Sequence, residues 1–320
     1  MTEKDTSRIK EKNIGVLCVL AASFIWAIEV ILVKLAYNSG SALDTLMIRN
    51  LIIAIMAVIY LAIINKSFIN KPFINKSFIN KPSSLNFSFN HLNNTLRISK
   101  TELYHIILIS IILTIADGFF YFGLGKVTAV NGVLVSHMQP IFIVFFGYFL
   151  LKEKLTKFDY FGMFIMLFSA MLVTTRTFDN LLTLQFGSTG DLLILTAACI
   201  WGLCAVLTKK YLSKISAAHI VFYRFITAFV LLFVYLSSSS NLTVPNNYQL
   251  ALGVVVGVGI ILYYEGFQRI KAAQVSALEL ASPFFAAVLG FFILGETVTI
   301  MQIAGILLMF LGVYLLTKRE

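Results

Sequence analysis

Residues 15–37 read GVLCVLAASFIWAIEVILVKLAY, and residues 191–209 read DLLILTAACIWGLCAVLTK. Both runs are apolar and hold one tryptophan and one lysine, and the members of each pair are 175 positions apart. A bilayer core needs roughly 20 apolar residues in helical form, so each run is long enough to cross it. The shared pattern indicates an internal duplication.

The duplication continues along the chain in a constant register. Arg49 and Arg224 keep the offset of 175 that relates Trp26 to Trp201 and Lys34 to Lys209. Farther along, the offset becomes 143, and the matched pairs are Tyr121 with Tyr264, Gly123 with Gly266, Ala129 with Ala272, Pro140 with Pro283, Glu153 with Glu296 and Gly162 with Gly305. One longer loop in the first copy accounts for the difference of 32 residues. This loop, residues 65–100, includes most of a tandem INKSF/INKPF repeat, which is either a neutral expansion or a tether to anionic lipid.

Composition and charge placement favour a membrane protein. Hydrophobic residues make up 59% of the 320 residues and charged residues only 12%, whereas a soluble domain carries roughly 25% charged residues. With the N-terminus in the cytoplasm, the cytoplasmic segments hold 20 lysines and arginines and the opposite ends hold three. The net charge of +10 therefore orients the protein and faces anionic lipid, and we expect no nucleic-acid partner.

The sequence predicts an all-α membrane protein with ten transmembrane helices, arranged as two inverted five-helix repeats. Each repeat has an odd number of spans, so the second copy must lie upside down relative to the first. We expect a cytoplasmic N-terminus over 1–14, a first repeat over 15–175 with the cytoplasmic insertion 65–100, and a second repeat over 191–317. Both termini are expected in the cytoplasm, and the location is expected to be a prokaryotic plasma membrane. The predicted spans are 15–37, 43–64, 103–125, 128–151, 158–175, 191–209, 217–236, 250–267, 273–294 and 298–316.

Ionisable side chains within the spans are the candidate functional groups, because each costs roughly 2.5–3.5 kcal/mol at the bilayer centre. Helical spacing places Trp26 beside Glu29 and Tyr121 beside Asp117. If these faces converge, the group is acidic and aromatic, and it suits a cationic or zwitterionic substrate or a carboxylate that exchanges a proton. The alternative is that the acids pair with donors in a purely structural role. The predicted substrate- or proton-binding residues are Trp26, Glu29, Asp117, Tyr121, His137, Trp201, Tyr264 and Glu279.

Prolines and arginines inside the spans have two interpretations each. Pro140 and Pro283 each free a carbonyl near mid-span, which indicates either a hinge beside the site or a kink needed for packing. Arg49 and Arg224 lie about one and a half turns inside their spans. We expect them to extend to the nearby interface rather than to bind an anion.

The repeated motifs resemble the EamA family of the drug/metabolite transporter superfamily. They comprise Trp and Lys in the first span, Arg in the second, Pro in the fourth, Leu-x-Glu at its end and Gly in the fifth. In the first copy these are Trp26, Lys34, Arg49, Pro140, Leu151-Lys-Glu153 and Gly162; in the second, Trp201, Lys209, Arg224, Pro283, Leu294-Gly-Glu296 and Gly305. The resemblance implies a ten-helix transporter of amino acids, metabolites or drugs, with a central site lined largely by the first, third, fourth, sixth, eighth and ninth helices.

We therefore predict a secondary active transporter of a small metabolite, amino-acid-like or cationic or zwitterionic, that works by alternating access and is not an enzyme. Its partners are the substrate and the lipid bilayer, no cofactor or metal is expected, and proton or ion coupling and the oligomeric state are left open. One alternative is an exchanger of phosphorylated solutes or nucleotide sugars, which needs basic residues where the acids lie. Another is a membrane-embedded metal-dependent enzyme using His137, Asp117 and Glu279, although no compact ligand motif supports it.

Overall fold

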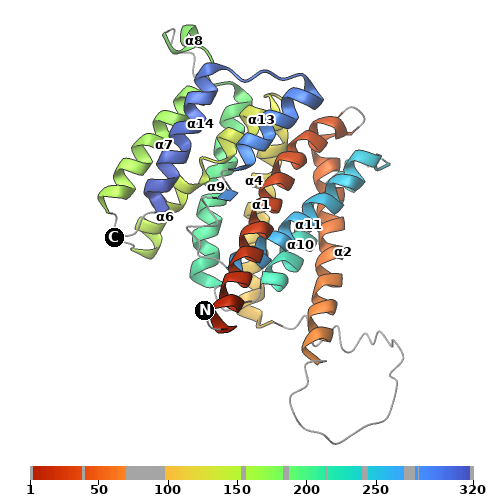
Figure 1. Cartoon of the computed structure of the whole chain (residues 1–320). Coiled ribbons are helices and arrows are strands. Elements are labelled where there is room, and N and C mark those ends of the chain that lie inside the picture. Colours follow the sequence, from red (N-terminus) through yellow and green to blue (C-terminus); the bar gives the residue numbers. More distant parts are fainter. Residues whose placement is uncertain are drawn as a thin grey trace, which may run out of the picture.

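The protein is a bundle of α-helices in a computed structural model that describes residues 3–37, 40–69, 98–152, 156–182, 187–212, 215, 217–239, 244–269, 278–279 and 281–317. Within these ranges every regular element is helical (Figure 1). The elements are α1 Glu3–Ala36, α2 Ala42–Ile69, α4 Lys100–Leu124, α5 Ala129–Ser136, α6 Gln139–Leu151, α7 Lys157–Thr175, α8 Phe178–Leu182, α9 Thr189–Tyr211, α10 Ala217–Ser238, α11 Asn247–Arg269, α13 Ala281–Leu294 and α14 Ile300–Thr317. Most of the predicted insertion, 70–97, lies outside the described residues.

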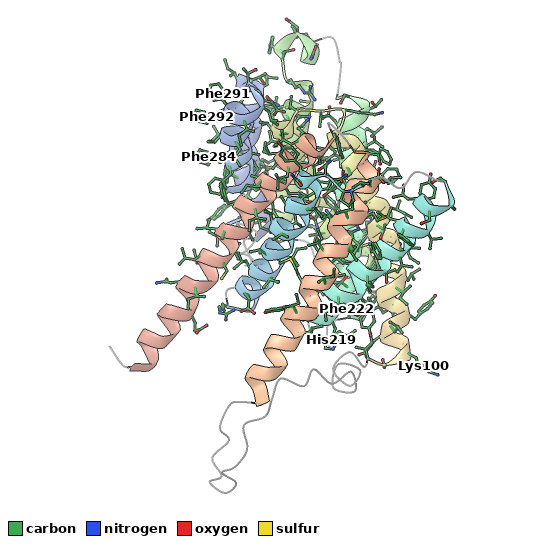
Figure 2. All side chains as sticks on the ribbon, turned by 90° about the vertical axis from the view of Figure 1, so that its right-hand side faces the viewer. Lys100, His219, Phe222, Phe284, Phe291 and Phe292 are labelled. Carbon is green, nitrogen blue, oxygen red and sulfur yellow. The ribbon has the colours of Figure 1, made fainter. Side chains whose placement is uncertain are left out.

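Six stretches of the described chain are long and apolar enough to cross a membrane, and four shorter apolar helices accompany them. The outer surface of the bundle carries large apolar side chains. Phe284, Phe291 and Phe292 are 57–77% exposed, and Figure 2 shows them along the outer side of α13. An apolar surface of this kind is typical of a face that contacts lipid or another protein.

The predicted span 128–151 is two helices rather than one. The chain leaves the helix at His137 and Met138, between α5 and α6, and Pro140 lies in the first turn of α6. A proline is tolerated there because the first N–H groups of a helix have no intrahelical acceptor. Pro283 occupies the equivalent first turn of α13. Both prolines therefore lie in the first turn of a helix. The predicted span 128–151 agrees with an apolar stretch, Ala129–Leu151, that is long enough to cross a membrane, but its helix is interrupted at His137 and Met138.

Helices distant in sequence pack side by side. The most extensive contacts join α1 to α11, α4 to α9, α2 to α10 and α7 to α14 (Figure 1). In lipid, helix association depends on close packing rather than on the hydrophobic effect, and small residues permit it. Gly253 of α11 is such a residue, because a Cβ there would lie 2.6 Å from the Ile52 side chain of α2.

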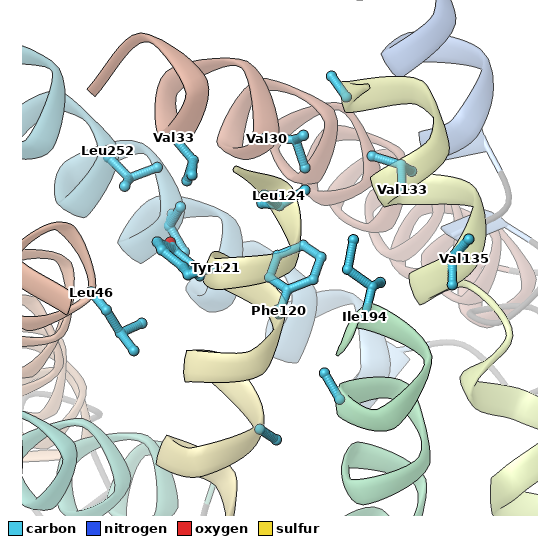
Figure 3. Close-up of a cluster of buried hydrophobic side chains, with 14 of the residues drawn as sticks. Val30, Val33, Leu46, Phe120, Tyr121, Leu124, Val133, Val135, Ile194 and Leu252 are labelled. Carbon is cyan, nitrogen blue, oxygen red and sulfur yellow. The ribbon is translucent and has the colours of Figure 1, made fainter. Parts of the chain in front are cut away.

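The core lies where α1, α4, α5 and α9 meet. Figure 3 shows Phe120, Tyr121 and Leu124 of α4 facing Val30 and Val33 of α1, Val133 of α5 and Ile194 of α9. Tyr121 is fully buried and is the largest such side chain in the described residues. Because α4 faces all three of the other helices, its polar side chains are also held in the centre of the bundle.

Candidate functional site: a charged cluster between helices

Arg49 of α2 is buried and fully hydrogen-bonded. Its Nε donates to Asn50 Oδ1 at 3.2 Å, and Nη2 donates to Asn50 Oδ1 at 3.1 Å and to Asp117 Oδ2 at 2.9 Å. Nη1 donates to Glu29 Oε1 at 2.8 Å and to the Tyr121 hydroxyl at 3.0 Å. A guanidinium has five N–H donors, so every donor of Arg49 has an acceptor.

Asp117 of α4 receives donors from both halves of the chain. Its Oδ1 accepts a hydrogen bond from Trp201 Nε1 of α9 at 2.9 Å. Its Oδ2 accepts from Arg49 and lies 3.6 Å from Nη2 of Arg224, on α10. The side chain is only 6% exposed, so its charge depends on these partners rather than on water.

Glu29 of α1 completes the cluster through its Oε1 atom, which accepts hydrogen bonds from Arg49 and from the Tyr121 hydroxyl, the latter at 3.0 Å. Two carboxylates, Glu29 and Asp117, thus face two guanidiniums, Arg49 and Arg224. The ring of Phe225 lies near both cations, with its centroid 5.9 Å from Arg49 Cζ and 4.9 Å from Arg224 Cζ. We call these residues, with Tyr121, Trp201 and Asn50, the charged cluster.

The charged cluster corrects two expectations from the sequence. Arg49 does not extend to an interface, because its side chain is 7% exposed and ion-paired inside the bundle. The convergence of Glu29 and Asp117 does not produce an acidic group either, because an equal number of arginines is present. The faces of Glu29 and of Asp117 with Tyr121 do converge, and Trp201, which no shared face had linked to them, joins them through Asp117.

The other predicted residues form a second group. His137 Nδ1 donates a hydrogen bond to the Val133 carbonyl at 2.8 Å, and the ring is also hydrogen-bonded to the backbone of Glu279. The Glu279 carboxyl is hydrogen-bonded by Tyr263, whose ring centroid is 6.4 Å from that of Trp26. The side chain of Tyr264 lies outside the described part of the chain.

Sequence reasoning missed the arginines and Asn50 as members of the site. A usable signal was present, since Arg49 and Arg224 fall inside apolar spans like Glu29 and Asp117. Buried ionisable groups of opposite sign are expected to pair. Their spacing along the chain does not reveal which acid meets which arginine, because that depends on how α2, α4 and α10 pack.

A separate polar contact holds the start of α5. Glu296, in the segment between α13 and α14, accepts hydrogen bonds from the backbone N–H groups of Ala129 at 2.7 Å and Val130 at 3.2 Å. Nearby, Lys34 at the end of α1 donates to the carbonyls of Leu124 and Val127. An acceptor at a helix N-terminus satisfies N–H groups that have no intrahelical partner, so Glu296 ties the two halves of the chain together at this end, while Lys34 joins α1 to the end of α4 within the first half.

Comparison with known proteins identifies the class. The profile of the EamA-like transporter family matches residues 13–175 and again 188–318. An uncharacterised transporter of Methanothermobacter thermautotrophicus is 32% identical over 229 residues, which cover 69% of this chain and 66% of the relative. The riboflavin transporter ImpX of Fusobacterium nucleatum is 25% identical over 256 residues, covering 73% of this chain and 83% of that protein.

A solved structure has the same fold. It matches with a TM-score of 0.60 at 16% sequence identity and covers 97% of this chain and 98% of its own. This similarity concerns the fold alone, whereas the two matched segments of the family profile span nearly the whole sequence. The chain belongs to the EamA-like transporter family, whose members are membrane transporters and not enzymes.

Proposed function

We propose that the protein is a secondary active transporter of a small zwitterionic metabolite, amino-acid-like in its charges, and that the charged cluster is its binding site. The observation that carries this proposal is the pairing of two carboxylates with two guanidiniums around Trp201 and Tyr121. A site with both signs of charge complements a solute with both signs. A phosphorylated solute would need an excess of positive charge, which the balanced cluster does not offer.

Glu29 supplies an acceptor for the positive end of such a solute. Both of its hydrogen bonds in the described part of the chain go to Oε1, which leaves Oε2 without a partner there. A substrate ammonium bound at Oε2 would form a charge-assisted hydrogen bond, which is stronger than a neutral one. The aromatic rings of Trp201 and Phe120, 5.1 Å apart between centroids, pack together next to Asp117, to which Trp201 donates.

Alternating access in this proposal rests on ten spans in two inverted repeats, over 15–175 and 191–317. Support for this number comes from the six long and four shorter apolar helices of the described chain, which overlap the ten predicted spans. Several helix ends agree with the duplication register: α1 and α9 end 175 residues apart, α2 and α10 begin 175 apart, α7 and α14 begin 143 apart, and α6 and α13 end 143 apart. Lys152 and Gly295, also 143 apart, both have positive φ, at 57° and 65°.

Helix packing supports the same arrangement. If the copies are exchanged, the contact of α1 with α11 becomes that of α9 with α4, and the contact of α6 with α9 becomes that of α13 with α1. The pairs α2 with α10 and α7 with α14 map onto themselves. A pseudo-twofold axis between two copies has this effect, and it places binding sites at the interface between them. The charged cluster joins α1, α2 and α4 of one copy to α9 and α10 of the other.

Transport into proteoliposomes tests the proposal. Purified protein is assayed with radiolabelled amino acids and riboflavin, the latter because of the relative named for it. We expect uptake of a zwitterionic solute by the native protein, loss of uptake in Asp117→Asn, and retention in Glu102→Gln, whose carboxyl caps the exposed start of α4. Equal uptake by the native protein and Asp117→Asn would remove the charged cluster as the site. Glu279→Gln, tested alongside, decides whether the second group is also required.

A further inference from the structure

We propose that Arg224 binds a carboxylate group of the transported substrate. This carboxylate would take the role that protein acceptors have at Arg49. This inference rests on the proposed function, because it assigns one charge of the substrate to one side chain of the charged cluster. Arg224 is partly accessible, with 28% of its side chain exposed, compared with 7% for Arg49.

The two arginines differ in how completely they are paired. Arg49 has an acceptor for each of its five donors. Arg224 has one ion pair with Asp117 at 3.6 Å, which is longer than a good hydrogen bond, and one contact with the ring of Phe225. In the residues that the structure describes, the guanidinium of Arg224 is therefore short of acceptors.

The duplication register explains this difference. The partners that hold Arg49 are Glu29, Asn50 and Asp117, and their counterparts in the second copy are Cys204, Phe225 and Ile260. Of these counterparts, Phe225 contacts Arg224 directly, with its ring centroid 4.9 Å from Arg224 Cζ. Three polar partners in one copy are thus a thiol, a ring and an alkyl chain in the other. The second copy keeps the arginine without the acceptors that satisfy its counterpart.

A carboxylate is the group that best supplies the acceptors that the Arg224 guanidinium lacks. The planar fork of a guanidinium binds a carboxylate through two parallel hydrogen bonds, and a charged group in a membrane protein is costly without such partners. A second donor in the charged cluster also lacks an acceptor, since Asn50 Nδ2 is buried and unpaired among the described residues. A monoanion suits the balanced charge of the cluster better than a doubly charged phosphate, because Glu29 and Asp117 already supply two negative charges.

Arginine-specific labelling tests the assignment without a transport assay. The purified full-length protein in detergent is treated with phenylglyoxal, a neutral reagent, and adducts at each arginine are quantified by mass spectrometry. The reaction is run in sodium chloride, sodium 3-phenylpropionate or disodium phenyl phosphate at equal ionic strength. Arg269 is the matched control, because its side chain is 29% exposed, nearly the same as that of Arg224, but is paired with Glu11 and Glu265.

We expect Arg224 to react faster than Arg49 and Arg269, and phenylpropionate at ten times its Kd to slow that reaction about tenfold. The protection should be absent at Arg269. Equal rates in all three salts, or a reaction at Arg224 no faster than at Arg49, would overturn the proposal. Protection by phenyl phosphate alone would replace the carboxylate with a phosphate and also overturn it.

A second measurement uses thermal unfolding of the same protein. Phenylpropionate should raise the melting temperature of the native protein and of Arg269→Gln but not that of Arg224→Gln. An equal rise in all three would contradict the assignment. If Arg224→Gln does not fold, the labelling of the native protein decides the question alone. Failure of both tests with intact transport would remove the carboxylate site and leave the proposed function standing.

Discussion

Arg49 joins three helices through its own side chain, because its acceptors lie on α1, on α4 and next to it on α2. An arginine in this position neutralises two buried carboxylates at once. Removing one member of a buried ion pair leaves its partner charged and without compensation, and this costs about 3–5 kcal/mol. At the scale of single residues, we therefore expect the charged cluster to stabilise the bundle in addition to its proposed role in binding.

The first prediction concerns Arg49→Gln, which removes the cation from between Glu29 and Asp117. We expect a loss of about 3–5 kcal/mol of stability, seen as a lower melting temperature in detergent, because two buried charges lose their partner. Arg269→Gln, whose ion pairs are partly exposed, should change the stability by no more than about 1 kcal/mol. Equal melting temperatures for the two variants would show that Arg49 does not hold the bundle together.

The second prediction concerns the Tyr121 hydroxyl, which accepts from Arg49 and donates to Glu29. Tyr121→Phe keeps the ring in the core but leaves a buried donor and acceptor short of one partner each. We expect a cost of about 1–3 kcal/mol. Tyr104→Phe, at a side chain that is 63% exposed, should be neutral. A double-mutant cycle of Tyr121→Phe with Glu29→Gln should show coupling, and strict additivity would contradict the described hydrogen bond.

Residue chemistry in the site could be predicted only in part from the sequence. The sequence predicted that Trp26 and Glu29 share one helix face and that Asp117 and Tyr121 share another. Such a prediction needs only the period of a helix. The pairing of Asp117 with Arg49 and Arg224 could not be predicted, because it depends on how α4 packs against α2 and α10. The cost of burying an arginine does not show whether its side chain extends to the membrane interface or is ion-paired inside the bundle.

At the scale of elements, the two helices α5 and α6 have two separate contacts with the second half of the chain, one at the start of α5 and one at the break between them. The start of α5 is held by Glu296, and the break at His137 contacts the backbone of Glu279. Glu296 is oriented by the turn at Gly295, where φ is 65°, and by its own N–H, which donates to the Gly290 carbonyl at 3.0 Å. The segment after α13 thus anchors a helix of the other half of the chain.

The third prediction concerns this anchor. Glu296→Ala removes the acceptor for the N–H groups of Ala129 and Val130, and loss of a helix cap costs about 0.5–2 kcal/mol. Hydrogen exchange of the peptide that contains residues 129–132 should be faster by about 2- to 30-fold if that cost falls on local opening. Glu102→Ala, which removes the capping box of α4, is the control and should leave that peptide unchanged. Unchanged exchange in Glu296→Ala would show that the contact does not support α5.

Element positions were largely readable from the sequence, since apolar runs of membrane length leave few choices. The limits of α4, α7 and α10 lie close to the predicted spans. The prolines indicated a discontinuity but did not fix its kind. A proline is compatible with a kink inside a helix or with the first turn of a new one, and the backbone around His137 and Met138 decides between them.

At the scale of the whole molecule, the two copies have diverged at the site while keeping a common scaffold. The counterparts of Glu29, Asn50 and Asp117 are apolar or weakly polar, whereas Arg49 and Arg224, like Trp26 and Trp201, are kept in both copies. The first copy therefore supplies both carboxylates of the charged cluster, whereas the second copy supplies donors, Arg224 and Trp201, but no carboxylate. Such asymmetry is expected of a site that binds an asymmetric solute between two related units.

The fourth prediction concerns orientation. The bias of lysine and arginine, 20 against three, predicts that both chain termini lie in the cytoplasm. A green fluorescent protein fused after Glu320 should fluoresce in a bacterial host, and alkaline phosphatase at the same position should be inactive. Active phosphatase there would contradict the assigned orientation. Replacing Lys152 and Lys157 with Gln, in a loop assigned to the cytoplasm, should not by itself reverse it because many basic residues remain.

The proposed transporter has a site between two inverted copies that opens alternately to each face of the membrane. Access to the charged cluster from both faces tests this most directly. Cys204, the counterpart of Glu29, is buried and lies close to Arg224, and Cys18 and Cys199 can be replaced by serine. The variant is reconstituted in liposomes, and a membrane-impermeant thiosulfonate is added either outside or inside. If the site opens to each face in turn, Cys204 should be modified from both faces. Modification from one face only, or from neither, would contradict it.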